Sequence, residues 1–174
     1  MTEIVALCYC SRPVGFSFQR VEEILQESRR NNATAKVTGA LIYDNWTFLQ
    51  WIEGEKANVR QIFERINNDS RHTDIRILTV RKLNDRWFPD WSMTAAVTEG
   101  QTLRGLRLVP HVSLKQFDPF QWSQSDTIRF MKALSDYLTR RPAPASHAAS
   151  GAETPEPAPR DPLTVLDAYL SRLP

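Results

Sequence analysis

The sequence lacks the glycine-rich loops that cradle phosphate groups in many nucleotide-dependent enzymes. Its 6 glycines are scattered, with neither a Gly-x-Gly-x-x-Gly run nor a phosphate-loop pattern. The three histidines, at positions 72, 111 and 147, lie too far apart for the spacing of a metal site. No local motif suggests a Ser/His/Asp or Cys/His set. We therefore expect a chain that is not an enzyme and holds no metal.

Cysteine is equally scarce, since only Cys8 and Cys10 occur. On one strand their side chains would point the same way, about two residue rises apart, which is near the outer limit for a disulfide. Two thiols also cannot complete a tetrahedral metal site. We expect both cysteines to be small, buried, apolar residues.

Long apolar runs and an excess of one charge are also missing. No stretch approaches the ~20 apolar residues of a membrane span. The N-terminal residues 1–4 show no basic segment leading into an apolar run, so we expect no signal peptide and a cytoplasmic location. The 22 basic and 20 acidic residues leave a net charge of only +2, and the basic ones are dispersed. We expect neither nucleic acid nor membrane as a partner.

Hydrophobic periodicity predicts two helices among five strands in the first hundred residues. We expect strands at 4–10, 37–43, 47–52, 75–80 and 92–97, and helices at 18–31 and 56–69. Asp44-Asn45 suits a two-residue hairpin turn between the second and third strands. The order β-α-β-β-α-β-β predicts an α+β fold with a ferredoxin-like, five-stranded sheet.

The strand at 47–52 is apolar on both sides. Phe48, Gln50 and Ile52 point to one face, while Leu49 and Trp51 point to the other. Such a strand lies inside a sheet that is covered on both faces. The helices at 18–31 and 56–69 can cover one face. For the other we predict a helix at 125–139, with these apolar residues turned inward: Ile128, Met131, Leu134, Tyr137 and Leu138.

The C-terminal part changes in composition. We divide the chain into a folded domain at 1–100, a helical cap at 101–140, a disordered Pro/Ala-rich linker at 141–162 and a short amphipathic tail helix at 163–174. About twelve residues are marginal as an isolated helix, so this tail either docks on the domain or frays. Both outcomes remain open from the sequence.

Gln50 is a polar residue in an apolar strand. A buried amide must find partners for two donor hydrogens and a carbonyl oxygen, because an unpaired group costs roughly 1–3 kcal/mol. A structural glutamine bonded to backbone is one explanation. Tyr9, on the first strand, and Asn31 and Asn32, at the end of the first helix, are likewise ordinary when each is taken alone.

Taken in order, these residues form a more specific pattern. The succession is Tyr9-x-Ser11-Arg12, Arg30-Asn31-Asn32, Val37–Tyr43, Phe48–Glu55, Asp69–His72 and Trp91-Ser92-Met93. It resembles the BLUF family, the blue-light sensors using flavin, over residues 3–97, and the chain looks like a short, single-domain type. The ordered set is far more specific than any one of its elements.

The resemblance implies a flavin ring held between the two helices of the ferredoxin-like domain. It implies that Tyr9 is the photochemical electron donor and Gln50 the amide whose hydrogen bonds rearrange, with Trp91 and Met93 as a switchable pair. It also implies a set of residues around the flavin: Ile24, Ser28, Asn31, Asn32, Phe48, Gln50, Arg65, Ile66, Asp69, Arg71 and His72. The cofactor is a flavin, with FAD placed before FMN and riboflavin.

The expected output is contact with a signalling protein in trans, or a change of a homo-oligomer, because the residues after the sensor are too few for an ordinary effector domain. An RNA-binding module of the same topology is the alternative. Such modules expose aromatic residues on an open sheet and carry a characteristic Lys/Arg-Gly-aromatic run, which is absent here.

Overall fold

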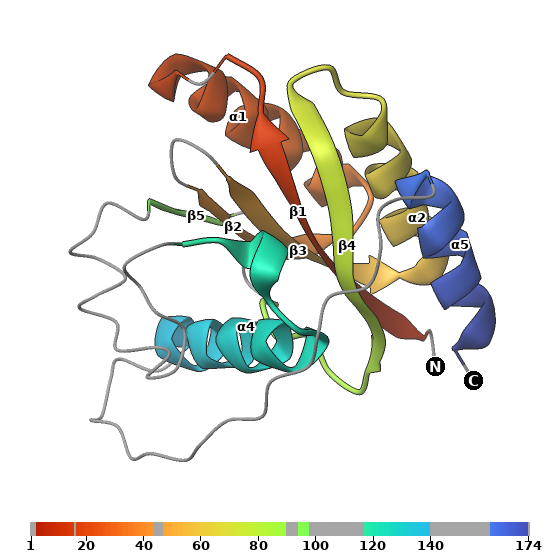
Figure 1. Ribbon diagram of the computed structural model, residues 1–174. Coiled ribbons are helices and arrows are strands. Elements are labelled where there is room, and N and C mark those ends of the chain that lie inside the picture. The colour runs from red at the N-terminus through yellow and green to blue at the C-terminus, as the bar shows by residue number, and fades with distance from the viewer. Residues whose placement is uncertain are drawn as a thin grey trace.

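The computed structural model describes residues 3–15, 17–43, 47–89, 94–97, 117–139 and 161–173 of the 174-residue chain. The side chains at 18, 94–97 and 137–139 are outside this description. The expected turn residues Asp44 and Asn45 also lie outside the described residues. Figure 1 gives the arrangement of the elements around a single sheet.

The sheet has the strand order β4-β1-β3-β2-β5. The strands are β1 (Ile4–Pro13), β2 (Thr38–Tyr43), β3 (Phe48–Glu55), β4 (His72–Leu83) and β5 (Thr94–Val97). The first four pair antiparallel, while β5 runs parallel to β2. The predicted α+β fold with an antiparallel sheet and helices is confirmed.

Three strands are longer than periodicity predicted. β1 extends past Cys10 to Pro13, β3 extends past Ile52 to Glu55, and β4 begins at His72 instead of residue 75 and continues to Leu83. β1 and β4 pair along this whole length, with register shifts after Cys8 and Cys10. Polar residues at the strand ends break the apolar pattern without breaking the hydrogen-bonded ladder, which is why the sequence pattern stopped short.

Helices α1 (Phe18–Thr34) and α2 (Lys56–Asn67) lie on one face of the sheet. Ser17 caps α1, because its side chain accepts a hydrogen bond of 3.2 Å from the backbone N–H of Arg20. The helix continues past the predicted residue 31 and stops before Lys36, whose φ of 52° is incompatible with a helix.

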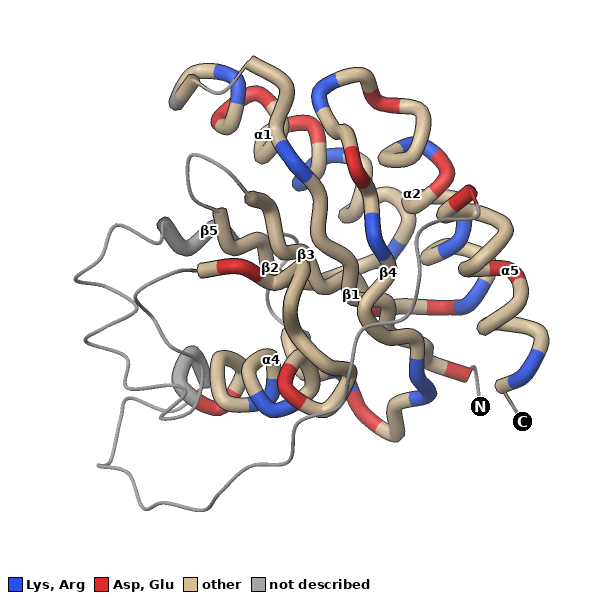
Figure 2. Tube along the Cα trace, in the orientation of Figure 1, with Lys and Arg blue, Asp and Glu red and all other residues tan. Residues whose placement is uncertain are grey.

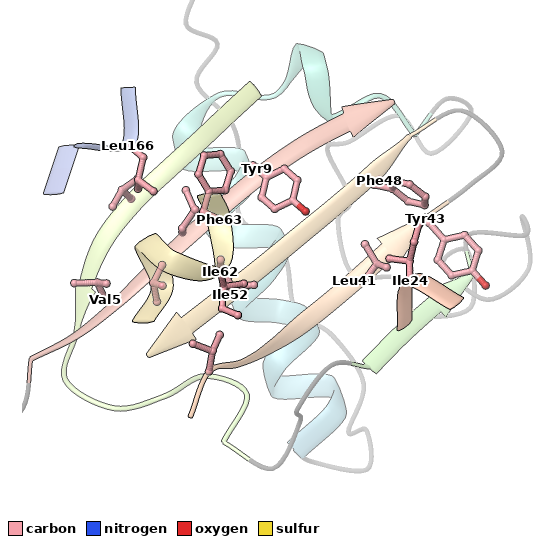
Figure 3. Close-up of a cluster of buried hydrophobic side chains, with 14 of the residues drawn as sticks. Val5, Tyr9, Ile24, Leu41, Tyr43, Phe48, Ile52, Ile62, Phe63 and Leu166 are labelled. Atoms are coloured by element: carbon pink, nitrogen blue, oxygen red, sulfur yellow. The ribbon is translucent and has the colours of Figure 1, made fainter. Parts of the chain in front are cut away.

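The α1/α2 side of the sheet holds a continuous apolar core. Tyr9 and Phe48 from the sheet meet Ile24 of α1 and Phe63 of α2 in this cluster (Figure 3). The cluster also takes in Leu166 from the C-terminal helix. Side chains from segments far apart in the sequence therefore surround Tyr9 on this side.

The opposite face of β3 packs against α4 (Gln124–Thr139). Leu49 and Trp51 are fully buried in a second cluster together with Met131 and Leu134. Between β5 and this helix a short 3₁₀ turn, η1 (Pro119–Gln121), was not predicted.

The inward face of α4 differs from the predicted one. Ile128 is only half-buried, whereas Thr127 and Phe130 are fully buried. The prediction for Ile128 is therefore wrong, and the side chains of Tyr137 and Leu138 lie outside the described residues. Thr127 donates a hydrogen bond of 2.9 Å to the backbone oxygen of Ser123, which lets a polar residue occupy the inward face.

The C-terminal helix α5 (Pro162–Arg172) docks beside α2 and over β4. Leu166 and Leu170 are buried, and Arg60 of α2 forms a two-pronged ion pair with Asp167 at 2.7 and 3.0 Å. Lys56 also donates to the carbonyl oxygen of Leu170 at 2.5 Å. Of the two outcomes open from the sequence, the structure shows docking.

None of the helices in the described part of the chain has the length and apolarity that a bilayer crossing requires.

The structure predicts a clear difference between two neighbouring residues of α4. Phe130→Ala should lower the free energy of unfolding by about 3–5 kcal/mol, because it leaves a cavity against the sheet. The matched control Ile128→Ala should cost much less, since its side chain is half-exposed. Urea unfolding measures both values, and an equal cost for the two variants would contradict the described orientation of α4.

Candidate functional site

The centre of the candidate site is a hydrogen bond between two neighbouring strands. Tyr9 of β1 stands directly opposite Gln50 of β3 in the antiparallel register. The Tyr9 hydroxyl donates to Gln50 Oε1, and both side chains are buried, with 0% and 4% exposure. Strand pairing brings the two residues together, although 41 positions separate them in the sequence.

The surroundings keep the Tyr9 phenol protonated. Burial raises the pKa of Tyr9 well above its ordinary value, and the neighbouring Cys8 and Asp69 add to that rise. The ring stands edge-on to Phe63 of α2, with the ring centres 5.4 Å apart and a 68° angle between the planes. Tyr9 is thus a neutral hydrogen-bond donor in a dry, apolar setting.

Helix α1 brings four of the predicted residues to one side. Ile24 and Asn32 are buried, while Ser28 and Asn31 are half-buried. Positions 24, 28 and 31 follow the helical repeat, so their side chains share one face. Two amides and a hydroxyl therefore line the α1 side of the same core that contains Gln50.

Helix α2 contributes less than the sequence suggested. Ile66 is half-buried against the apolar core, but Arg65 is exposed. Among the described elements α2 packs closely on β1, β3, β4 and α5, and no such close packing joins it to α1. The two helices cover the same face of the sheet without being tightly packed together (Figure 1).

The segment after α2 carries a network of charged side chains. Arg71 Nε and Nη2 donate to the two carboxylate oxygens of Asp69 at 2.9 and 2.7 Å. Arg71 also reaches Glu27 of α1 at 2.5 Å, which ties this segment to the first helix. Burial alone would raise the pKa of Asp69, but the hydrogen bonds from Arg71 lower it overall. The same partners raise the pKa of Arg71.

His72 begins β4 at the edge of this network. Its Nδ1 lies 2.9 Å from Ser11 Oγ, and its ring centre lies 5.2 Å from that of Phe48. Burial lowers the pKa of His72 to about 4; Asp69 opposes this effect and Arg71 adds to it. His72 is therefore neutral at pH 7.

The structure brings most of the predicted residues to the α1/α2 side of the sheet, but it does not test the predicted switch pair. Trp91 and Met93 lie outside the described residues, so their predicted role stays a prediction.

Cys8 and Cys10 are buried and free, on the α4 side of the sheet. Burial raises the pKa of the Cys10 thiol to about 12 and that of Cys8 as well, in keeping with a packing role.

Sequence reasoning missed Glu53, which is fully buried. Its carboxylate accepts hydrogen bonds from Trp51 Nε1 at 2.9 Å and from the backbone N–H groups of Trp87 and Phe88 at 3.0 and 2.7 Å. The signal was available, because alternation along β3 places position 53 on the same covered face as Trp51. A carboxylate there requires several donors.

Comparison with known proteins gives a consistent match to one family. The family model described as "BLUF: Sensors of blue-light using FAD" matches residues 4–94. Among curated relatives, a photoactivated adenylate cyclase subunit beta of Euglena gracilis is 32% identical over 100 residues. That match covers 57% of this chain but only 11% of the cyclase subunit. The chain thus spans a small part of the curated relatives it matches.

Solved structures agree over a larger share of the chain. A dark-state structure of BlrB, a BLUF protein, is 29% identical with a TM-score of 0.62, and the match covers 78% of this chain and 98% of that one. The photo-activated state of BlsA is 28% identical with a TM-score of 0.67, covering 76% and 94%.

His72 predicts a specific dependence of stability on pH. Its pKa is lower in the folded chain (about 4) than in the unfolded one (about 6.5), so the unfolded state binds more protons between these values. Stability should fall as pH drops from 6.5 to 4, by at most about 3 kcal/mol and by less where water reaches the ring. Unfolding curves for wild type and His72→Gln measure the effect. Identical slopes in this window would contradict the assignment.

Proposed function

The chain belongs to the BLUF family, the sensors of blue light using FAD, and we propose that it senses light through the Tyr9–Gln50 pair beside a flavin held between α1 and α2. The observation that carries this proposal is the buried hydrogen bond from a phenol to an amide in the middle of the sheet. Buried polar groups must be paired, so any change at one partner forces a change at the other.

The residues on the α1/α2 side fit a flavin chemically. Its ring system has a polar edge of alternating donors and acceptors and two flat apolar faces. Asn31 and Asn32 offer amides that match such an edge. Ile24 on α1 and Ile66 on α2 offer apolar contact from two separate helices. Both helices lie on the same face of the sheet, as a flat group between them requires.

The basic residues fit the phosphate-bearing end of the cofactor. Arg71, held by Asp69 and Glu27, lies beyond the end of α2 near His72. In this proposal Arg71 and His72 contact the ribityl and phosphate groups, with Arg65 reaching in from the surface. Ser28 and Phe48 complete the lining. FAD is the form named for the family, and FMN and riboflavin remain alternatives within this proposal.

The bound flavin would supply the absorption of blue light and accept an electron when excited. In this proposal Tyr9 is the oxidisable group that donates this electron. A phenol that loses an electron becomes a strong acid, so its proton would pass along the existing hydrogen bond to Gln50 Oε1, while Gln50 would release a proton from Nε2 toward the group that took the electron. Return of the electron and a proton to Tyr9 would leave Gln50 either with a rotated amide or in its other tautomer, and either change would present a different donor pattern to its neighbours.

The rearranged amide could act on the rest of the sheet through the segment that leads to β5. In this proposal Trp91 and Met93 exchange places near Gln50 and shift β5, which pairs with β2. A buried network of this kind is worth enough to bias an element with two stable positions.

Signalling is proposed to occur through another protein or through a change of a homo-oligomer. The cyclase relatives combine a similar domain with a much longer chain, and a further relative from Escherichia coli K12 is named a blue light- and temperature-regulated antirepressor. That relative is 33% identical over 57 residues, 33% of this chain and 14% of its own. The domain thus serves proteins with different outputs, which favours a sensor role without catalysis of its own.

The RNA-binding alternative is not favoured. Modules of that kind keep one sheet face open for stacking bases. Here Phe48 and Leu49, adjacent on β3, are buried on opposite faces of the sheet, in the α1/α2 core and the α4 core respectively. Neither face offers exposed aromatic rings in the part of the chain that the structure describes.

Removing the polar group of either Tyr9 or Gln50 should abolish the spectral response to light without removing the colour of the bound flavin. Tyr9→Phe deletes the hydroxyl and Gln50→Leu deletes the amide, so both variants should bind flavin and lose the reversible red shift under blue light. Tyr169→Phe is the matched control, because this tyrosine is exposed on α5 and should leave the shift intact. Absorption spectra before and after illumination give the result. A normal shift in Tyr9→Phe would refute the assigned role.

Deleting residues 142–174 should change the kinetics of the response but not the colour. Leu166 of α5 lies in the same core as Phe63, which touches Tyr9. Loss of α5 should loosen this packing and change the rate of return to the dark state by several-fold. Leu166→Ala should shift the rate in the same direction. An unchanged rate in both variants would show that α5 does not influence the return to the dark state.

A further inference from the structure

A pocket of about 580 Å³ lies on the far side of the sheet from the proposed flavin site. Its walls come from the end of β4, the turn after it and α4, and they include Arg81, Arg86, Trp87 and Lys132. Figure 2 shows basic segments on α4 and another toward the lower end of β4, with acidic segments between them. No role in light sensing assigned above uses this pocket.

The cations around the pocket differ in the hydrogen bonds and ion pairs that they form within the protein. Lys132 pairs with Asp136 at 2.5 Å, and Arg86 donates to the backbone oxygens of Glu53 and Lys36 at 2.8 and 2.6 Å. Arg81 differs, because its buried Nε finds no hydrogen-bond acceptor among the described residues. A buried donor without an acceptor is costly, so a ligand oxygen that reaches this guanidinium gains an interaction the protein leaves open.

Trp87 forms the aromatic wall of the pocket. The guanidinium carbon of Arg81 lies 5.3 Å from the centre of its ring, and Lys132 Nζ lies 5.7 Å from it. The ring also stacks on Trp51, with the centres 4.6 Å apart and the planes inclined by 7°. Trp87, whose ring contacts both cations, is therefore packed directly on Trp51 of β3.

Glu53 fixes this wall to the strand that carries Gln50. Its buried carboxylate accepts from the backbone N–H of Trp87 and from the indole of Trp51, the residue next to Gln50. One stacked ring and one shared carboxylate therefore connect Trp87 to the residue next to Gln50. Only a few contacts thus separate the cations of the pocket from the Tyr9–Gln50 pair, although the cations lie on the other face of the sheet.

We propose that this pocket binds the carboxylates of an acidic segment of the partner protein, and that its affinity differs between dark and lit states. The proposal rests on the proposed function for its light dependence. The lining carries four basic side chains against two acidic ones, Asp85 and Asp136. Lys82 pairs with Glu3 at 2.8 Å and Lys132 pairs with Asp136, so the surplus of positive charge lies on Arg81 and Arg86, against one further acidic lining residue, Asp85. The two acidic groups repel a compact phosphate dianion more than an extended chain, whose separate carboxylates can reach Arg81 and Arg86.

The experiment follows the Arg81 Nε–H signal by NMR in the full-length, flavin-loaded protein. The probes are an eight-residue peptide of alternating Glu and Ala, its Gln–Ala counterpart and inorganic phosphate. The Glu–Ala peptide should shift the Arg81 signal saturably, and the other two should not. Its affinity should change at least threefold when the sample is illuminated.

Variants separate a pocket from general attraction to positive charge. Lys132→Gln should weaken the Glu–Ala peptide about fivefold, while Arg172→Gln removes the same charge from the exposed end of α5 and should change little. Equal weakening in both, or equal binding of the Gln–Ala peptide, would overturn the pocket assignment. Tighter binding of phosphate would overturn the carboxylate assignment.

The failure of this inference is distinguishable from the failure of the proposed function. A protein that keeps its reversible red shift but binds the peptide equally in dark and light would overturn the docking proposal alone. A protein without a red shift would refute the proposed function, whether or not the peptide binds.

Discussion

The hydrogen bond from Tyr9 to Gln50 joins β1 to β3, two inner strands of the sheet. It lies in the middle of a sheet covered on both faces, where water cannot replace a lost partner. A phenol in this environment keeps its proton, and an amide in this environment must keep its bonds. The pair is therefore stable in one arrangement and sensitive to the removal of an electron or proton. These are the properties a light switch needs.

The two faces of the sheet connect this pair to different parts of the molecule. On the α1/α2 side Tyr9 touches Phe63, and through the same core it is linked to α5. On the α4 side Trp51 stacks on Trp87 and shares the carboxylate of Glu53 with it. Successive residues of β3 point to opposite faces of the sheet. A change at Gln50 would therefore occur beside the α1/α2 core, while the next residue, Trp51, lies in the α4 core. The proposed flavin side and the proposed docking pocket would thus both respond to a change in β3.

The sequence was sufficient for the order of strands and helices in the antiparallel part of the fold, whereas the position of Tyr9 opposite Gln50 follows from the pairing of β1 with β3, which periodicity does not give. Alternation along β3 correctly indicated a strand buried on both sides. It could not show how α4 is rotated, because Ile128 and Phe130 both continue an apolar repeat and only the shape of the opposing sheet decides between them. The docking of α5 was also undecidable, since it depends on Arg60 and Asp167, 107 residues apart. Alternation along β3 could have indicated that Glu53 is buried, but its donors, the indole of Trp51 and the backbone N–H groups of Trp87 and Phe88, are known only from the three-dimensional contacts.

Illumination should change the hydrogen bond between Tyr9 and Gln50. Light-minus-dark infrared difference spectroscopy on protein with isotopically labelled tyrosine tests it directly. We predict a reversible shift of the labelled phenol band that is absent from Tyr9→Phe. A difference spectrum containing only cofactor bands, with the labelled tyrosine band unchanged, would contradict the claim.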